Sequence, residues 1–340
     1  MVEAETTIPV KTLVTGATGL VGVHTVAELV SHGMGVRVLV RSPEKLLHCL
    51  EPFNITTELV EIVEGDISNT SALASYIDGC DALVHCAGIF SNDLSDRSKL
   101  QKINVDATRN ILTQAHQQKL DPIIYLSSYL ALFPPDGNIM TGDDTVKSPR
   151  AMYAGTKAEA ERIARTLQDQ GAPVVSVYPG SIQGPNDPTY GIGSQLLEQA
   201  VKTRKMLVTE GGRGFTDVRD LAQLIRKALV KGRGAKRYMF GGYFLEHREV
   251  LQLLANLSGR DIKPINVPGS VLRGIGSTID LLSKLTGKSY MLTREAAEVL
   301  TRSVPCDDSP AIDELELELV GCEKSFSDLL SWMKSSGKLR

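Results

Sequence analysis

The feature that most constrains the fold is a glycine-rich stretch near the start of the chain, residues 11–22, which reads Lys-Thr-Leu-Val-Thr-Gly-Ala-Thr-Gly-Leu-Val-Gly. An apolar run opens it, glycines recur at Gly16, Gly19 and Gly22, and an amphipathic segment follows over 20–32. The pattern predicts a strand, a tight turn and a helix. Glycine permits a sharp bend and a close ligand approach, and the first helical turn offers free N–H groups and the positive end of the helix dipole. The stretch is therefore suited to hold a pyrophosphate.

Strand and helix patterns alternate through the first half of the chain. Apolar runs that indicate buried strands occupy residues 36–40, 59–64, 81–85, 123–126 and 173–178, and helical patterns occupy 99–119 and 153–170. This alternation predicts an α/β fold, a Rossmann-type doubly wound parallel sheet with right-handed crossovers. Ligands of such sheets bind beyond the carboxyl ends of the strands. Gly16, Ala87 and Ser128 all fall at such ends.

Tyr153 and Lys157 are four residues apart at the start of a predicted helix, so we expect both side chains on one face. Reduction of a carbonyl by hydride requires a proton for the developing alkoxide, and a phenol with a pKa of about 10 exchanges it poorly near neutral pH. A nearby ammonium and an oxidised nicotinamide favour the phenolate, so we expect the pKa of Tyr153 to be lowered. By itself the pair is also compatible with a surface contact.

The Thr-Gly-x-x-Gly-x-x-Gly turn, the Tyr-x-x-x-Lys pair and Ser127-Ser128 after the fifth strand, in this order, resemble the extended short-chain dehydrogenase/reductase superfamily. Within it the chain looks most like the NAD-dependent epimerase/dehydratase family and its dihydroflavonol-4-reductase-like members. The helix containing Ile103-Asn104-Val105 is similar to a helix of the same family. The resemblance implies that Ser128 orients the substrate oxygen, Tyr153 supplies the proton, and Lys157 tunes Tyr153 and holds the nicotinamide ribose.

The turn and the resemblance together imply a cofactor site spread over the carboxyl ends of the strands. Its expected residues are Gly16, Thr18, Gly19, Leu20, Val21, Gly22, Arg41, Lys45, Asp66, Ile67, Cys86, Ala87, Gly88, Ser127, Tyr153, Lys157, Pro179, Gly180, Ser181 and Ile182. Asp66 would lie beside the adenine, although it could equally cap the next helix. His85 ends a strand and is interpreted as structural rather than as a base. No metal site is expected.

The end of the second strand bears on which dinucleotide binds. An acidic residue there would bind the ribose hydroxyls of NAD, whereas a cation faces the 2′-phosphate of NADP. Arg41, followed one helical turn later by Lys45, therefore predicts NADP(H) as the cofactor. The alternative is that both are ordinary solvated charges at the start of a helix.

The length of 340 residues fits one large domain with a smaller lobe attached. We expect residues 1–180, with 215–242 returning to them, to form the NADP(H)-binding domain, and 181–214 with 243–340 to form a smaller, mostly C-terminal substrate lobe. The helical stretch 267–288 is apolar along one face and could be a lid, an interface or core.

The composition favours a small-molecule partner over nucleic acid or an anionic membrane, because the formal net charge is only -3. Five widely spaced cysteines without a C-x-x-C motif suggest reduced thiols and a cytoplasmic location. Residues 1–10 lack the pattern of a secretion signal, and no apolar run is long enough for a membrane span. Family precedent favours a homodimer.

These observations predict an NADPH-dependent oxidoreductase that reduces a ketone or aldehyde of a small to medium, apolar substrate. Two alternatives remain. The first is an NAD-linked nucleotide-sugar epimerase or a 3β-hydroxysteroid-type dehydrogenase, which Arg41 disfavours. The second is a catalytically silent NADP-sensing regulator, which the Tyr153 and Lys157 pair disfavours.

Overall fold

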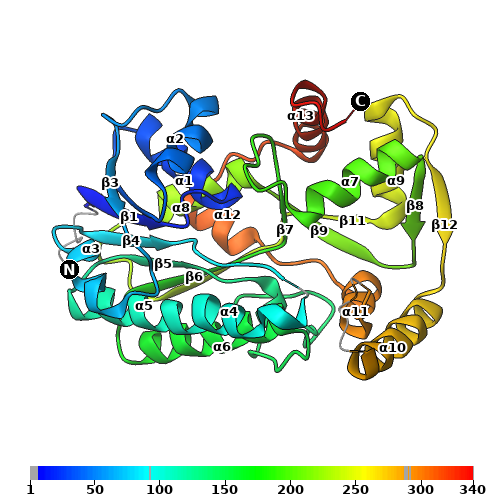
Figure 1. The fold of residues 1–340 in the computed structure, drawn as a ribbon, viewed down its shortest axis with the longest axis horizontal. Coiled ribbons are helices and arrows are strands. Elements are labelled where there is room, and N and C mark those ends of the chain that lie inside the picture. The colour runs from blue at the N-terminus through cyan, green and yellow to red at the C-terminus, as the bar shows by residue number, and fades with distance from the viewer. Residues whose placement is uncertain (1–6, 92, 287–289, 291, 340) are drawn as a thin grey trace.

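The computed structural model describes residues 7–339, apart from 92, 287–289 and 291. Residues 1–6 and the last two residues of the predicted helix 267–288 therefore lie outside the described part of the chain. Figure 1 shows a larger lobe around a central sheet and a smaller lobe beside it. Among the described helices, none has the length and apolar character that crossing a bilayer requires.

A seven-stranded sheet forms the centre of the larger lobe. Its strands are β1 (Lys11–Thr15), β2 (Gly35–Val40), β3 (Glu61–Glu64), β4 (Ala82–His85), β5 (Ile123–Leu126), β6 (Val174–Pro179) and β10 (Lys236–Phe240). They lie in the order β3-β2-β1-β4-β5-β6-β10, and every pair is parallel. The order reverses direction after β1, so the predicted Rossmann-type doubly wound sheet is confirmed.

Helices cover both faces of this sheet (Figure 1). One layer holds α1 (Leu20–Ser31), α2 (Pro43–Leu50), α8 (Val218–Ala228) and α12 (Ser309–Leu315), and the other holds α3 (Leu73–Ile77), α4 (Arg97–Leu100), α5 (Thr108–Gln117) and α6 (Met152–Asp169). Successive strand residues face opposite layers: Val14 packs in the first core and Leu13 in the second. The two cores fix the sheet and hold the carboxyl ends of its strands at one edge.

The smaller lobe comes mainly from the second half of the chain. Its helices are α7 (Ile192–Thr203), α9 (His247–Ser258), α10 (Gly269–Thr286), α11 (Arg294–Arg302) and α13 (Cys322–Ser335). Its strands form a two-stranded sheet of β8 (Lys205–Val208) with β12 (Lys263–Asn266), and a three-stranded sheet in the order β11 (Tyr243–Glu246), β9 (Gly212–Asp217), β7 (Ser181–Gln183). Phe215 and Phe326 meet in its core at a ring-centroid distance of 5.1 Å.

Three features differ from the expected elements. The helix predicted over 99–119 is interrupted by a π-helical segment, Gln101–Ala107, between α4 and α5. The strand expected near 215 is β9, which pairs in the three-stranded sheet, whereas the following α8 packs on α1 of the larger lobe. The strand predicted from 59 begins at Glu61.

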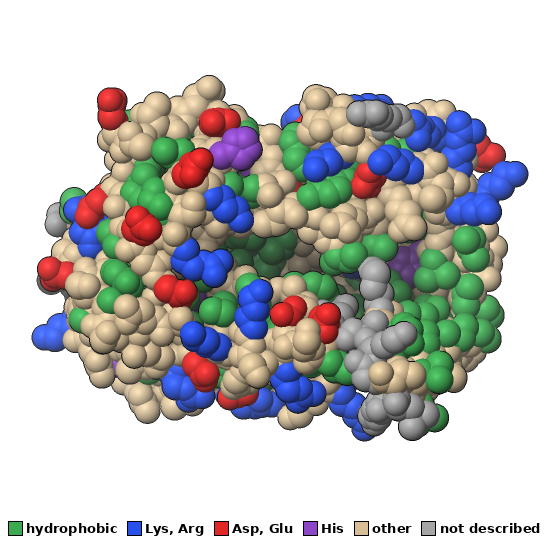
Figure 2. Space-filling model, in the orientation of Figure 1, with side chains coloured by type: hydrophobic (Ala, Val, Ile, Leu, Met, Phe, Trp, Pro, Cys, Tyr) green, Lys and Arg blue, Asp and Glu red, His purple; other side chains and the backbone are tan. Residues whose placement is uncertain are grey.

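Helix α10 is not a core helix, because one of its faces is exposed. Leu272 is buried, but Val271 is 50% exposed. Figure 2 shows hydrophobic side chains gathered over this part of the smaller lobe, where β12 and α10 lie. The exposed apolar residues in these two elements are Ile265, Val271, Ile275, Leu281 and Leu282.

Candidate functional site

The glycine turn between β1 and α1 folds as the sequence predicts. Gly16 has a φ of 75°, a left-handed value that favours glycine, and a Cβ there would lie 2.6 Å from the Ala87 nitrogen. The Gly19 N–H donates to the Gly16 carbonyl at 2.9 Å. A Cβ on Gly22 would collide with the same carbonyl oxygen, so glycine there lets α1 begin close against the strand end.

The start of α1 suits an anionic ligand. Gly19 is the N-cap, no side chain caps the helix, and no acidic residue lies in its first turn. The first helical N–H groups, which begin at Leu20 and Val21, therefore lack a side-chain acceptor, and the helix dipole places positive potential there. Thr18 precedes the cap and is half-buried. These residues fit the pyrophosphate of a dinucleotide.

The ends of β2 and β3 lie next to each other on one side of this turn. Arg41 and Lys45 are exposed, and among the described residues neither side chain forms an ion pair. Asp66 accepts the Ser68 N–H at 2.8 Å, which lowers the pKa of Asp66, and the positive charge of Arg41 lowers it further. Asp66 thus stabilises a turn that includes Ile67, rather than capping a helix.

Ser128, Tyr153 and Lys157 come together at the carboxyl end of β5. Lys157 is buried on α6, and its Nζ donates to the Leu126 carbonyl at 2.7 Å and lies 5.1 Å from the centre of the Tyr125 ring. Tyr153, one turn earlier on α6, forms a side-chain hydrogen bond with Ser128. Two residues of one helix therefore meet the same strand end, as the spacing predicts.

The ionisation of these groups is set mainly by burial. Burial raises the pKa of Tyr153 to about 12, Tyr129 adds to the increase, and the hydrogen bond with Ser128 opposes it. The expected lowering of the pKa of Tyr153 is therefore wrong for the protein alone, because desolvation disfavours the phenolate more than its partners favour it. Burial also lowers the pKa of Lys157 to about 8, although Glu161 opposes this change.

His85 is structural, as the sequence analysis expected. Its Nδ1 is 2.8 Å from the Thr15 hydroxyl and its Nε2 is 2.9 Å from the Thr108 hydroxyl, so both ring nitrogens are engaged. Burial lowers its pKa to about 3, which keeps the imidazole neutral near physiological pH.

The chain after β4 runs close to the glycine turn. The Cys86 N–H donates to the Thr15 carbonyl at 3.2 Å, and the Ala87 N–H donates to the Thr15 hydroxyl at 3.4 Å. Gly88 follows, beside Asn104. Ser127, buried after β5, donates its N–H to the Val177 carbonyl at 2.9 Å. These segments lie along the same edge of the sheet as Gly16.

The turn at 179–182 leaves the central sheet and enters the three-stranded one. Pro179 ends β6, and Ser181 and Ile182 belong to β7. The Gly180 N–H donates to the Phe240 carbonyl at 3.2 Å and to the Thr216 hydroxyl at 3.0 Å. This turn therefore joins the two lobes. Figure 2 shows a hollow between them, with hydrophobic side chains inside.

Sequence reasoning did not assign roles to Asn104 and Phe90. Asn104, in the π-helical segment, accepts the Ile89 N–H and donates to the Ile89 carbonyl, each at 2.9 Å, and also donates to the Thr156 hydroxyl at 3.0 Å. It thereby fastens the loop after β4 to α6. Phe90, next in that loop, is 52% exposed and meets the Tyr153 ring edge-on at 4.9 Å. The Ile103-Asn104-Val105 motif could have indicated a role for Asn104, whereas no sequence pattern indicates a role for Phe90.

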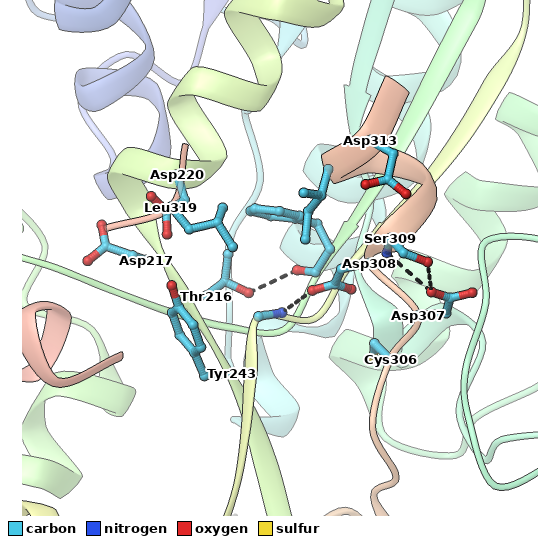
Figure 3. Close-up of a pocket in the computed structure, with 13 residues that line it drawn as sticks. Thr216, Asp217, Asp220, Tyr243, Cys306, Asp307, Asp308, Ser309, Asp313 and Leu319 are labelled. Atoms are coloured by element: carbon cyan, nitrogen blue, oxygen red, sulfur yellow. Dashed lines mark hydrogen bonds between the residues drawn. The ribbon is translucent and has the colours of Figure 1, made fainter. Parts of the chain in front are cut away.

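A separate pocket of about 490 Å³ lies where β9, α8, β11 and α12 meet (Figure 3). Asp308 accepts the N–H groups of Gly241 and Gly242, each at 2.7 Å, and so ties the chain before α12 to the end of β10. Burial raises the pKa values of Asp220 and Asp308 to about 6. The pocket lining includes neither Ser128 nor Tyr153, so this pocket is distinct from the predicted site.

Comparison with known proteins agrees with the fold and the motifs. Residues 12–241 match the model of the NAD dependent epimerase/dehydratase family. A Synechocystis sp. protein provisionally named dihydroflavonol 4-reductase is 27% identical over 335 residues, which cover 96% of this chain and 95% of that protein. A Stigmatella aurantiaca protein named 4-hydroxy-2-methyl-3-oxo-4-farnesyl-3,4-dihydroquinoline-1-oxide ketoreductase is 27% identical over 316 residues, 90% of this chain and 91% of that protein.

Solved structures share the fold along nearly the whole chain. The crystal structure of gox2253 superposes with a TM-score of 0.82 at 25% identity, covering 97% of this chain and 100% of the other. The dTDP-glucose 4,6-dehydratase DesIV from Streptomyces venezuelae, solved with NAD bound, gives a TM-score of 0.75 at 20% identity, with 97% and 99% covered. The second likeness concerns the fold alone.

Proposed function

The chain belongs to the NAD dependent epimerase/dehydratase family, and from that premise we propose that it is an NADPH-dependent reductase of a ketone or aldehyde carried by a small to medium, apolar substrate. The observation that carries this proposal is the meeting of Ser128, Tyr153 and Lys157 at the end of β5, on the sheet edge that also holds the glycine turn. A proton donor, a hydroxyl and an ammonium at this edge are the groups that carbonyl reduction requires.

Each of the three side chains has a distinct task in this proposal. A reduced nicotinamide, when bound, supplies the hydride for the carbonyl carbon. Ser128 donates a hydrogen bond to the carbonyl oxygen and orients it toward Tyr153, whose hydroxyl gives the oxygen its proton. Because the pKa of Tyr153 is about 12, the phenol is protonated at neutral pH and ready to donate. Lys157 stabilises the resulting phenolate, which solvent then reprotonates.

Two cations support NADP(H) as the cofactor. Arg41 is exposed just after β2, beside Asp66 and on the same edge as the glycine turn, and Lys45 is exposed in the first turn of α2. A guanidinium binds a phosphate through two parallel hydrogen bonds, so Arg41 is suited to the 2′-phosphate. All five cysteines are free thiols, which supports a cytoplasmic location.

An apolar substrate is supported by the surface next to the phenol. Phe90 exposes half of its ring while contacting Tyr153. A substrate whose carbonyl reaches Tyr153 would therefore contact this aromatic ring. The Stigmatella relative is named as a ketoreductase of a farnesyl-bearing compound, which is consistent with a substrate of this kind.

The proposal is tested by replacing the proton donor. We expect Tyr153→Phe to lower kcat for NADPH oxidation with a panel of aromatic and isoprenoid ketones and aldehydes by roughly 10²–10⁴-fold, the usual contribution of a general acid. The affinity for NADPH should stay within about threefold, because the ring and its packing remain.

Tyr238→Phe provides the matched control, because Tyr238 lies on β10 and its hydroxyl accepts a hydrogen bond from Arg233 instead. It should retain wild-type turnover. Full turnover by Tyr153→Phe would exclude the proposed proton donor.

A further inference from the structure

The helix that carries Tyr153 begins without a cap of its own. Ala151 occupies the N-cap position of α6, and no side chain near it in sequence accepts a hydrogen bond there. N-cap positions usually hold Ser, Thr, Asp or Asn, whose oxygens bind the free N–H groups of the first turn. The Ala151 carbonyl nevertheless starts the helical ladder, because it accepts the Gly155 N–H at 2.8 Å. The position of Ala151 thus sets the turn that contains Tyr153.

An acceptor for this segment comes from the other lobe. Glu295, on α11, places its Oε2 atom 2.7 Å from the Arg150 nitrogen and 2.6 Å from the Ala151 nitrogen, and it accepts both N–H groups. Hydrogen bonds to a carboxylate are roughly twice as strong as neutral ones, and a negative charge suits the positive end of a helix. One carboxylate therefore holds the two residues at which α6 begins.

Helix α11 is itself fixed to the smaller lobe. The Leu300 carbonyl accepts the Thr209 hydroxyl at 3.2 Å, and the Thr301 hydroxyl accepts a guanidinium N–H of Arg273 on α10 at 2.8 Å. A Cβ on Gly211 would collide with the Leu300 carbonyl oxygen, so glycine permits this close packing. Glu295 is therefore held by the smaller lobe while it binds the larger one.

We propose that Glu295 is a positioning residue for Tyr153. By holding the backbone at 150–151, its carboxylate keeps the phenol aligned with Ser128, and α11 thereby couples the substrate lobe to the proton donor. This inference rests on the proposed reductase function, because it concerns how the Tyr153 hydroxyl is positioned to protonate the substrate. A displacement of about 1 Å at a reacting group can cost 10²-fold in rate.

Burial raises the pKa of Glu295, despite the opposing hydrogen bonds from Ala151 and Arg150. A carboxyl whose folded pKa lies above its unfolded value costs folding stability once it is ionised, so its charge at neutral pH is unfavourable for folding. Replacement by Ala removes the charge and also the acceptor of both N–H groups, so the thermal midpoint is measured beside kcat to distinguish lost alignment from lost folding.

The experiment compares Glu295→Ala and Glu295→Gln with Glu298→Gln in the full-length protein. Glu298 is the matched control, because it lies on the same helix but pairs with Arg294 on the surface. The measurements are kcat and KM for carbonyl reduction, the Kd for NADPH, the thermal midpoint, and hydrogen exchange of residues 152–157.

We expect Glu295→Ala to lower kcat by roughly 10–100-fold, with the NADPH Kd within about twofold and the thermal midpoint lowered by no more than about 4 °C. Glu295→Gln retains an acceptor oxygen and should recover most of this loss, and Glu298→Gln should match the wild type. Exchange over residues 152–157 should be faster in Glu295→Ala alone.

Wild-type kcat in Glu295→Ala, or an equal loss in Glu298→Gln, would overturn the positioning role. Unchanged exchange over 152–157 would overturn it even if no carbonyl is reduced. In a further outcome, the wild type reduces no carbonyl while hydrogen exchange over 152–157 is still faster in Glu295→Ala. That result would contradict the proposed reductase function but support the role of Glu295 in fixing the start of α6.

Discussion

At the scale of single residues, Arg41 provides the sharpest test of cofactor choice. Its guanidinium is exposed just after β2, where we propose that it binds the 2′-phosphate of NADP(H). We expect Arg41→Ala to raise the Kd for NADPH by roughly 10–100-fold, since a charged hydrogen bond is worth about 1.5–3 kcal/mol. The Kd for NADH should change little, because NADH lacks that phosphate. Fluorescence titration with both dinucleotides measures this.

The control for Arg41 is Arg302→Ala, which removes an exposed arginine at the far end of α11. It should bind both dinucleotides as the wild type does. Tighter binding of NADH than NADPH by the wild type would contradict our interpretation of Arg41 and would favour the NAD-linked epimerase or dehydrogenase alternative.

Residues within local motifs could be predicted from the sequence, and residues with distant partners could not. Gly16 and Gly22 were predictable because a strand-to-helix turn needs glycine at fixed spacing. Glu295 could not be assigned, because its partners lie 144 and 145 residues away and α11 has no local link to α6. For the protein alone, the pKa of Tyr153 is shifted in the opposite direction to the prediction, because spacing does not report desolvation.

At the scale of elements, the buried parallel strands were the easiest to predict. Their apolar runs are continuous, and β5 was located at 123–126 as observed. The strands β7 and β9 were harder, because Ser-Ile-Gln and Gly-Arg-Gly-Phe-Thr-Asp contain no apolar run and their pairing is set by tertiary contacts. The small three-stranded sheet is therefore a result of the assembled lobes rather than of a local pattern.

The π-helical segment shows another limit of periodicity. A seven-residue stretch with wider turns leaves the apolar spacing of 99–119 nearly helical, so the sequence pattern indicates one continuous helix. The wider turn places Asn104 where it can reach both Ile89 and Thr156. A contact that fastens the loop after β4 to α6 thus arises from a local departure from regular helix.

At the scale of the whole molecule, the lobes are joined by buried polar contacts that should make stability depend on pH. His24 on α1 donates its Nε2–H to the Pro185 carbonyl at 2.9 Å, beyond the turn into the smaller lobe. Burial lowers the pKa of His24 from 6.5 to about 4. As the pH falls below 6.5, His24 becomes protonated in the unfolded chain, but in the folded chain it stays neutral until about pH 4. The free energy of unfolding therefore decreases between these two pH values.

We expect the free energy of unfolding to fall between pH 7 and pH 5, with His24 contributing about 1–2 kcal/mol of the decrease. His24→Gln keeps an N–H donor for Pro185 without the titration, so its decrease should be smaller. Urea unfolding at the two pH values measures the difference. His48→Gln, at a largely exposed position, should keep the wild-type decrease. If the free energy of unfolding decreased equally in His24→Gln and the wild type, His24 would not be the source of this pH dependence.

The central claim is that a nicotinamide held by the Gly16 turn delivers a hydride to a carbonyl whose oxygen is protonated by Tyr153. The most direct measurement is mass spectrometry of the alcohol formed from NADPH carrying deuterium on one or the other face of C4. We predict that one of the two labelled cofactors transfers a single deuterium to the carbinol carbon and that Tyr153→Phe forms almost none of this product. An alcohol without deuterium from either cofactor, or an isomerised product formed without net oxidation of NADPH, would contradict the claim.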